Sequence, residues 1–143
     1  MSNKLTSSSK ALIGTAAIPI TLAAAYADAK SGRMPIADAN NLTLYVGYTM
    51  GTAEDTNSIQ LKIEFSDDGT TWYRKTNEAD STGTTTDTLQ EYTFAATGAA
   101  ATYDYFRIPV INLSDKHIKV SVKETGIAAN GGKCFIIANL AKE

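Results

Sequence analysis

The sequence has few of the side chains from which enzymatic and metal sites are usually built. Among 143 residues there is one cysteine, Cys134, and one histidine, His117. A single cysteine excludes an intramolecular disulfide and a cysteine-rich zinc site. No residue stands at ligand spacing from His117, and metal sites and catalytic triads both need such partners. We therefore expect no catalytic residue, no metal and no cofactor, and we predict that the protein is not an enzyme.

Charge and long apolar runs are also scarce. The chain has 13 Lys and Arg against 15 Asp and Glu, a formal net charge of −2. A nucleic-acid partner is not expected, because a nucleic-acid binder needs a basic surface to meet the phosphates. The apolar run in residues 11–25 is shorter than the roughly 20 residues that cross a bilayer, and Pro19 interrupts it. We therefore expect no membrane association.

The same run resembles the core of a secretory signal peptide. It follows Lys4 and Lys10 and ends in two A-x-A triplets within residues 25–29. The polar stretch before it, residues 2–10, is long for a signal, and threonines dilute the run. We favour the interpretation that this segment is not removed.

The clearest pattern in the chain is a β-hairpin over residues 58–73, SIQLKIEFSDDGTTWY. Its alternating apolar positions are Ile59, Leu61, Ile63 and Phe65. A period of two is typical of a strand with one buried face. Asp67-Asp68-Gly69 follows, and Asp-Gly between apolar runs indicates a turn because Gly accepts a positive φ. The two carboxylates are also calcium-ligand types, but further oxygen ligands are lacking, so we expect them to bind backbone amides in the turn.

Several other segments share this alternation. They are residues 18–22, 42–50, 92–96, 106–110, 118–122 and 134–140. Pro109 favours a sheet edge for its strand, since proline cannot donate a ladder hydrogen bond. The last segment is apolar on both faces, which predicts a central strand under a cover or a strand at a subunit contact. Seven or eight short strands predict an all-β protein, an antiparallel β-sandwich or jelly roll.

The N-terminal segment contains few large side chains. Residues 1–10 are polar, Pro19 favours a short edge strand, residues 22–30 suit a turn or two of helix, and 31–40 read as a loop. We expect residues 1–40 to form an extended arm outside the core and residues 41–143 to form the sandwich domain. An arm of this composition needs support from outside. Its predicted interface residues are Ile13, Ile18, Ile20 and Leu22.

A second group of candidate residues combines four aromatic side chains with one arginine. It consists of Trp72, Tyr73, Tyr103, Tyr105 and Arg107. The aromatic side chains suit a stacking platform for sugar rings, cross-strand packing, or a protein interface, where Tyr, Trp and Arg are enriched. We favour packing or an interface over a sugar site. A carbohydrate- or receptor-binding module, displayed on a virion or secreted, is the alternative function.

One family shares the general pattern of the chain. The patterns are LTLYVGYT, IQLKIEFSDDGTTWY, EYTFAATG, YDYFRIPV and HIKVSVKETG, after a small-residue N-terminal segment. Across about residues 15–140 the chain resembles the decoration, or auxiliary, capsid proteins of tailed bacteriophage heads, and Asp-Gly-x-x-Trp-Tyr is the sharpest element. The resemblance implies a virion structural protein on the outer capsid surface. It implies binding to major capsid protein subunits, often as a homotrimer, with no enzymatic activity and no cofactor.

Overall fold

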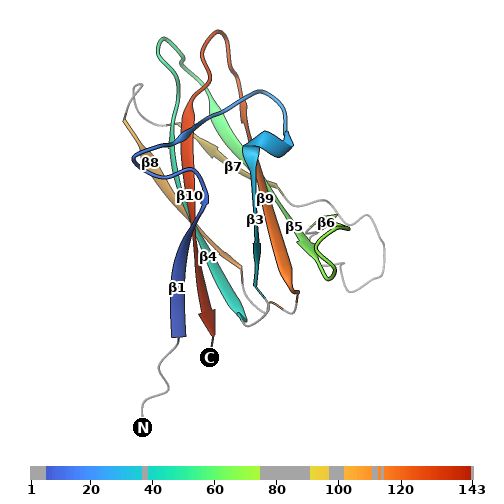
Figure 1. The fold of residues 1–143 in the computed structure, drawn as a ribbon. Helices are drawn as coiled ribbons and strands as arrows, with labels where there is room; N and C mark the ends of the chain where they lie inside the picture. Colours follow the sequence, from blue (N-terminus) through green and yellow to red (C-terminus); the bar gives the residue numbers. More distant parts are fainter. Residues whose placement is uncertain are drawn as a thin grey trace, which may run out of the picture.

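Two antiparallel five-stranded sheets pack face to face in the computed structural model (Figure 1). The structure describes residues 6–36, 39–74, 91–96, 102–110, 113 and 115–142. Sheet A has the order β1-β10-β4-β8, with β2 also paired to β10, and sheet B has the order β3-β9-β5-β6, with β7 also paired to β5. The strands are β1 (Thr6–Ile13), β2 (Ile20–Thr21), β3 (Ser31–Pro35), β4 (Asn41–Thr49), β5 (Ser58–Ser66), β6 (Tyr73–Arg74), β7 (Glu91–Ala95), β8 (Asp104–Val110), β9 (His117–Thr125) and β10 (Lys133–Lys142). The prediction of an all-β antiparallel sandwich is confirmed.

The core lies between the sheets and is built from the alternating positions. Fully buried side chains include Leu42, Leu44 and Val46 from β4, Ile59, Leu61 and Ile63 from β5, and Ile118, Val120 and Val122 from β9. Burying one such side chain contributes about 1.5–3 kcal/mol. The period of two therefore determines which face of each strand turns inward.

The predicted hairpin is confirmed, with a longer turn than the Asp-Gly pair alone suggests. β6 pairs with β5 only through Tyr73 and Arg74, and β7 then takes the same edge of β5. In the turn, Gly69 has φ +80°. The Asp68 carboxylate accepts the backbone N–H groups of Thr70 and Thr71, both at 2.8 Å. These hydrogen bonds hold the pKa of Asp68 well below its ordinary value, as expected for a carboxylate that satisfies a turn.

The placement of two strands in sheet A also follows the sequence. β8, which contains Pro109, is the last strand of sheet A beyond β4. β10 is apolar on both faces and lies between β4 on one side and β1 and β2 on the other. β10 is therefore a central strand of sheet A, because the N-terminal strands β1 and β2 pair with the edge that β4 leaves open.

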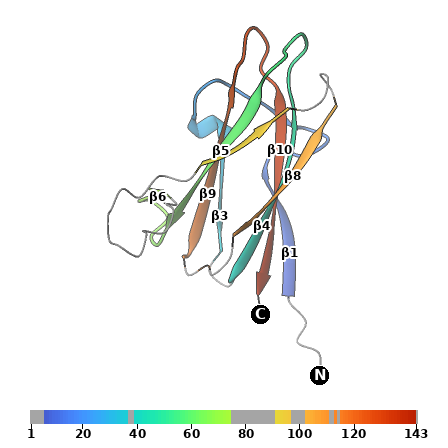
Figure 2. The same cartoon turned by 180° about the vertical axis from the view of Figure 1, so that it is seen from behind.

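The expectation that residues 1–40 lie outside the core is corrected for the part that the structure describes. β1 runs along β10 and β2 continues the same edge. The chain then crosses to sheet B, where the 3-10 turn η1 (Asp28–Lys30) leads into β3 beside β9 (Figures 1 and 2). The side chains that this segment buries in the core are Ile13, Leu22, Met34 and Ile36. The expected helix in 22–30 is reduced to η1, and 31–35 is a strand, not a loop.

Small residues explain why this part of the fold was hard to recognise. In β3, Gly32 takes an inward position, where a Cβ would lie 2.2 Å from the carbonyl oxygen of Leu12. A glycine here lets β1 and β3 approach and close the side of the sandwich. The crossing segment is tied to both sheets, because the Leu22 N–H donates to Gly132 O at 2.8 Å and the Glu124 N–H donates to Ala23 O at 2.9 Å. These backbone hydrogen bonds, together with a few buried apolar side chains, hold the crossing segment in place.

Candidate docking face on sheet A

The outward side chains of sheet A form two aromatic-containing rows across β10, β4 and β8. The pairing register aligns Phe135, Gly47 and Tyr105 across β10, β4 and β8. The next row holds Ile137, Tyr45 and Arg107. Tyr105 is 74% exposed and Tyr45 is 43% exposed. We call the outward surface around these two rows the docking face.

Phe135 organises this surface through a glycine. A Cβ at Gly47 would lie 2.3 Å from the Phe135 ring, so the ring lies directly over Gly47. Covering a strand glycine with a cross-strand aromatic stabilises the sheet. The Tyr103 and Tyr105 rings lie 5.6 and 6.5 Å from the Phe135 ring, within the range of favourable aromatic contacts. Tyr103 and Phe135 thus support Tyr105, which remains exposed.

A shallow hollow opens between these rings. It has a volume of about 170 Å³ and is lined by Tyr45, Val46, Tyr105, Phe106, Arg107 and Phe135. Small-molecule sites usually measure about 300–1,000 Å³. The hollow is therefore better suited to one anchoring side chain of a partner than to a whole cofactor.

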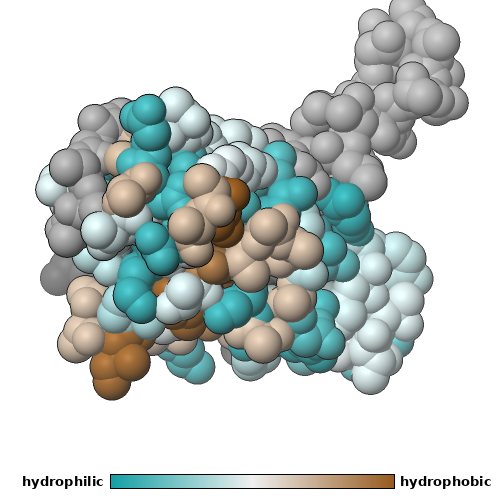
Figure 3. All heavy atoms as spheres, turned by 90° about the horizontal axis from the view of Figure 1, so that it is seen from above, coloured by the Kyte–Doolittle hydropathy of each residue, from teal (hydrophilic) through white to brown (hydrophobic). Residues whose placement is uncertain are grey.

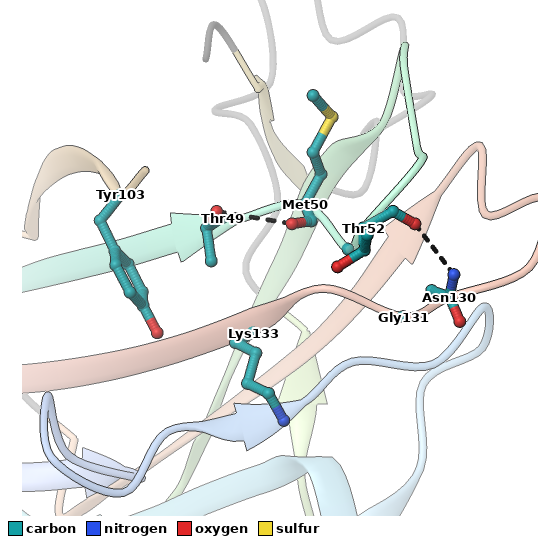
Figure 4. Close-up of a pocket in the computed structure, with 8 residues that line it drawn as sticks. Thr49, Met50, Thr52, Tyr103, Asn130, Gly131 and Lys133 are labelled. Atoms are coloured by element: carbon teal, nitrogen blue, oxygen red, sulfur yellow. Dashed lines mark hydrogen bonds between the residues drawn. The ribbon is translucent and has the colours of Figure 1, made fainter. Parts of the chain in front are cut away.

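A larger groove lies at the end of the sandwich beyond this face (Figure 4). Its volume is about 390 Å³, and its lining consists of Thr49, Met50, Gly51, Thr52, Tyr103, Asn130, Gly131 and Lys133. Lys133 Nζ donates to the Thr21 hydroxyl at 2.8 Å, and the Asn130 amide donates to Thr52 O at 2.9 Å. Hydrophilic and hydrophobic side chains interleave on this end of the molecule (Figure 3). The lining offers no paired acid and base for proton transfer.

One carboxylate fixes the loops at this end. Glu54, in the loop between β4 and β5, accepts the backbone N–H groups of Ala128, Ala129 and Asn130 at distances from 2.6 to 3.1 Å. These backbone hydrogen bonds lower the pKa of Glu54. The loop between β9 and β10 is therefore held against the loop between β4 and β5.

The aromatic platform considered as an alternative is split by the fold. Tyr73 belongs to β6 in sheet B, whereas Tyr105 lies on the outer face of sheet A. Trp72 is half-buried, with Arg33 and Lys119 at 5.6 and 5.9 Å from its ring. A single stacking platform that combines Trp72 and Tyr73 with the sheet A tyrosines is therefore wrong. Only Tyr103, Tyr105 and Arg107 of the predicted set lie on one face.

The outer face of sheet B is charged, and its charges are paired within the chain. Asp28 lies 3.3 Å from Lys119 and 3.5 Å from Arg33, and the hydrogen bond from Lys119 lowers the pKa of Asp28. The Tyr26 ring lies 4.8 Å from both Lys62 Nζ and Lys123 Nζ. Lys62 also meets Glu64 at 3.7 Å. Cation–π contacts and ion pairs thus cover this face.

The predicted arm residues have different environments. Ile13 and Leu22 are 3% exposed and belong to the chain's own core, so they are not available to a neighbouring subunit. Ile20 is partly buried against that core. Ile18 is 76% exposed in the loop after β1, where its N–H donates to the Thr15 hydroxyl at 2.9 Å. Of this set, Ile18 alone is freely exposed.

A buried polar pair was missed by the sequence analysis. The Tyr48 hydroxyl of sheet A donates to Glu124 Oε2 of sheet B at 2.5 Å, and Glu124 Oε1 accepts the Gly132 N–H at 2.7 Å. Glu124 is fully buried, and burial raises the pKa of Tyr48. The signal was present, because Glu124 continues the inward alternation of Ile118, Val120 and Val122. The pair joins the two sheets.

The two residues considered for reactivity lie in ordinary structural positions. Cys134 is fully buried in β10, and burial raises the pKa of its thiol to about 12, which opposes thiolate formation. His117 is partly buried at the start of β9. Within the described ranges, no three His, Cys, Asp or Glu side chains are grouped to hold a metal ion. No helix in those ranges has the length and hydropathy to cross a membrane.

Comparisons with protein-family models, with curated proteins and with solved structures give no match.

Proposed function

We propose that the protein is a non-enzymatic structural component of a protein assembly and that it binds its neighbour through the docking face. The observation that carries this proposal is an outer surface with aromatic side chains and no described carboxylate, on which Tyr105 is 74% exposed. Interface cores are depleted of Lys, Glu and Asp and enriched in Tyr, Phe and Arg. A supported, outward-pointing tyrosine is the type of residue that carries much of the energy at such interfaces.

The proposed assembly is the head of a tailed bacteriophage. This proposal draws on the family resemblance, which predicts a protein that decorates the outer capsid surface and binds major capsid protein subunits. We expect a homotrimer on the shell. Cementing proteins act by adding contact area between subunits, and an interface of about 1,000 Å² or more is the size expected for specific binding.

The test uses shells assembled from the major capsid protein encoded in the same genome. Wild-type protein should co-sediment with these shells and saturate them. Tyr105→Ser should lose most of this binding, whereas Tyr73→Ser should bind like wild type. The two tyrosines are matched, since they are 74% and 67% exposed and lie on opposite sheets. Absence of wild-type binding, or loss in the Tyr73 variant alone, would contradict the proposal.

The second candidate function is glycan binding by the same face. The observation in its favour is the pair of exposed rings, Tyr45 and Tyr105, around the hollow. Trp72 does not support it, because Arg33 and Lys119 already lie over its ring. Saturable binding on a glycan array that is lost in Tyr105→Ser, without any binding to shells, would favour this function.

A further inference from the structure

The charge of the docking face carries information about its partner, and the inference below rests on the proposed function. The charged side chains at its described outward positions are Arg107 in β8 and Lys133 in β10, both cationic. The other outward positions of β4 and β10 carry Asn41, Thr43, Tyr45, Gly47, Thr49, Phe135, Ile137, Asn139 and Ala141. Where side chains are described, then, this face presents positive charge and no carboxylate.

Arg107 lies where it can select the charge of a bound partner. It is exposed, lies in the same row as Tyr45 and Ile137, and lines the hollow together with Tyr105 and Phe135. A guanidinium beside an apolar hollow can bind a carboxylate through two parallel hydrogen bonds while the hollow receives an apolar side chain.

Neither sheet face of a second copy satisfies this requirement with its described side chains. Packing of two docking faces against each other would bring cations from both copies together. Packing against the outer face of sheet B would bring Arg107 close to a surface that carries Lys119 and Lys123. Among the described side chains of that surface, the carboxylates Asp28 and Glu64 already pair with cations of their own chain. Like charges across an interface are unfavourable.

We propose that the docking face recognises a different protein, through a segment that places a large apolar side chain in the hollow and an Asp or Glu carboxylate against Arg107. The apolar side chain supplies buried area, and the carboxylate sets the orientation. Both elements are needed, because a hollow of about 170 Å³ alone holds little more than a single anchor.

The test is selection of a random seven-residue peptide library on immobilised full-length protein. We expect enriched peptides to carry Asp or Glu within a few positions of a large apolar residue. Their affinity should fall about tenfold or more in Arg107→Gln, recover in part in Arg107→Lys, and stay unchanged in Lys123→Gln on the opposite sheet. Matching melting curves for the variants would exclude misfolding as the cause.

The possible failures separate the two proposals. Peptides that need Tyr105 but show no carboxylate enrichment and no loss in Arg107→Gln would overturn this inference and leave the docking face standing. Peptides that bind equally well to Tyr105→Ser would contradict the docking face itself. A library that enriches nothing on the wild type, or a face that binds glycans in place of peptides, would overturn the inference.

Discussion

The two outer faces of the sandwich differ although their inner faces are built alike. Sheets A and B both bury alternating Ile, Leu and Val side chains. Outside, sheet B carries Lys and Arg side chains that meet Asp28, Glu64, Tyr26 and Trp72 of the same chain. Sheet A instead presents Tyr45 and Tyr105 to solvent.

The difference shows that the described charges of sheet B find partners within the chain, whereas sheet A leaves apolar surface and a cation without partners. The ion pairs on sheet B, of which Lys62–Glu64 is largely buried, satisfy the charges where they stand. On sheet A, ordered apolar surface remains exposed, with a guanidinium beside it. An exposed apolar patch with a polar rim marks an interaction site. Four substitutions or deletions test this contrast, from the largest expected effect to the smallest.

Deleting residues 1–30 should abolish the fold on which both faces depend. The deletion removes β1 and β2, exposes the edge of β10, and takes Ile13 and Leu22 out of the core. Loss of each buried side chain costs about 2–5 kcal/mol, and whole domains are stable by only about 5–15 kcal/mol. Circular dichroism should show no cooperative unfolding. A truncated protein that still melts cooperatively would show that the segment is an arm after all.

Gly47→Ala should displace the Phe135 ring of the docking face and lower the stability of the protein. The new Cβ would lie 2.3 Å from the Phe135 ring, which must move. Overpacking of this kind costs about 1–3 kcal/mol and should also weaken binding, because Phe135 supports Tyr105. Thr43→Ala, on the same face of β4, is the control and should change the free energy of unfolding by less than about 0.5 kcal/mol. Equal stability of the two variants in denaturant titrations would contradict this prediction.

Tyr48→Phe should lower the stability of the protein more than the same substitution at Tyr45, which lies on the outward face of the same strand. It leaves the buried Glu124 carboxylate without the Tyr48 hydroxyl, so unfolding free energy should fall by about 1–3 kcal/mol. Tyr45→Phe, on the outward face of β4, should change stability by less than about 0.5 kcal/mol. Urea denaturation of both variants measures the difference, and the prediction fails if their midpoints coincide.

Glu54→Gln should have the smallest effect, and it should depend on pH. Backbone hydrogen bonds lower the folded pKa of Glu54 from 4.5, so its stabilising contribution is present above that pH and is lost as the pH falls through the folded value. The variant should melt below wild type at pH 7, and the gap should narrow below about pH 4.5. Asp55→Asn, at an exposed neighbouring carboxylate, is the control. A gap that stays constant with pH would contradict this account.

The fold was predictable wherever large apolar residues alternate. The alternation in β4, β5 and β9 determined their inward faces, and Pro109 indicated the edge position of β8. β3 escaped prediction because Gly32 occupies an inward position and leaves Met34 as the main apolar signal. In residues 14–30, the packing depends on backbone approach at glycines and on hydrogen bonds to distant strands, which no local pattern encodes.

The candidate site was predictable in part. Tyr105 and Arg107 share the outward face of β8, and Tyr103, just before that strand, contacts the Tyr105 and Phe135 rings. The contributions of Tyr45 and Phe135 depend on the order β10-β4-β8, because the rows form only when those strands lie side by side. Trp72 was grouped with the tyrosines by residue type, yet the hairpin places it beside Arg33 and Lys119, on the other sheet.

The most direct test of the docking face is hydroxyl-radical footprinting of the wild-type protein, free and bound to shells of the co-encoded major capsid protein. Radical labelling reports solvent access to each tyrosine without any substitution. We predict strong protection of Tyr105 and Tyr45 in the bound state and unchanged labelling of Tyr73 on sheet B. Protection of Tyr73 with unchanged labelling of Tyr105 would contradict the central claim and assign binding to sheet B near β6.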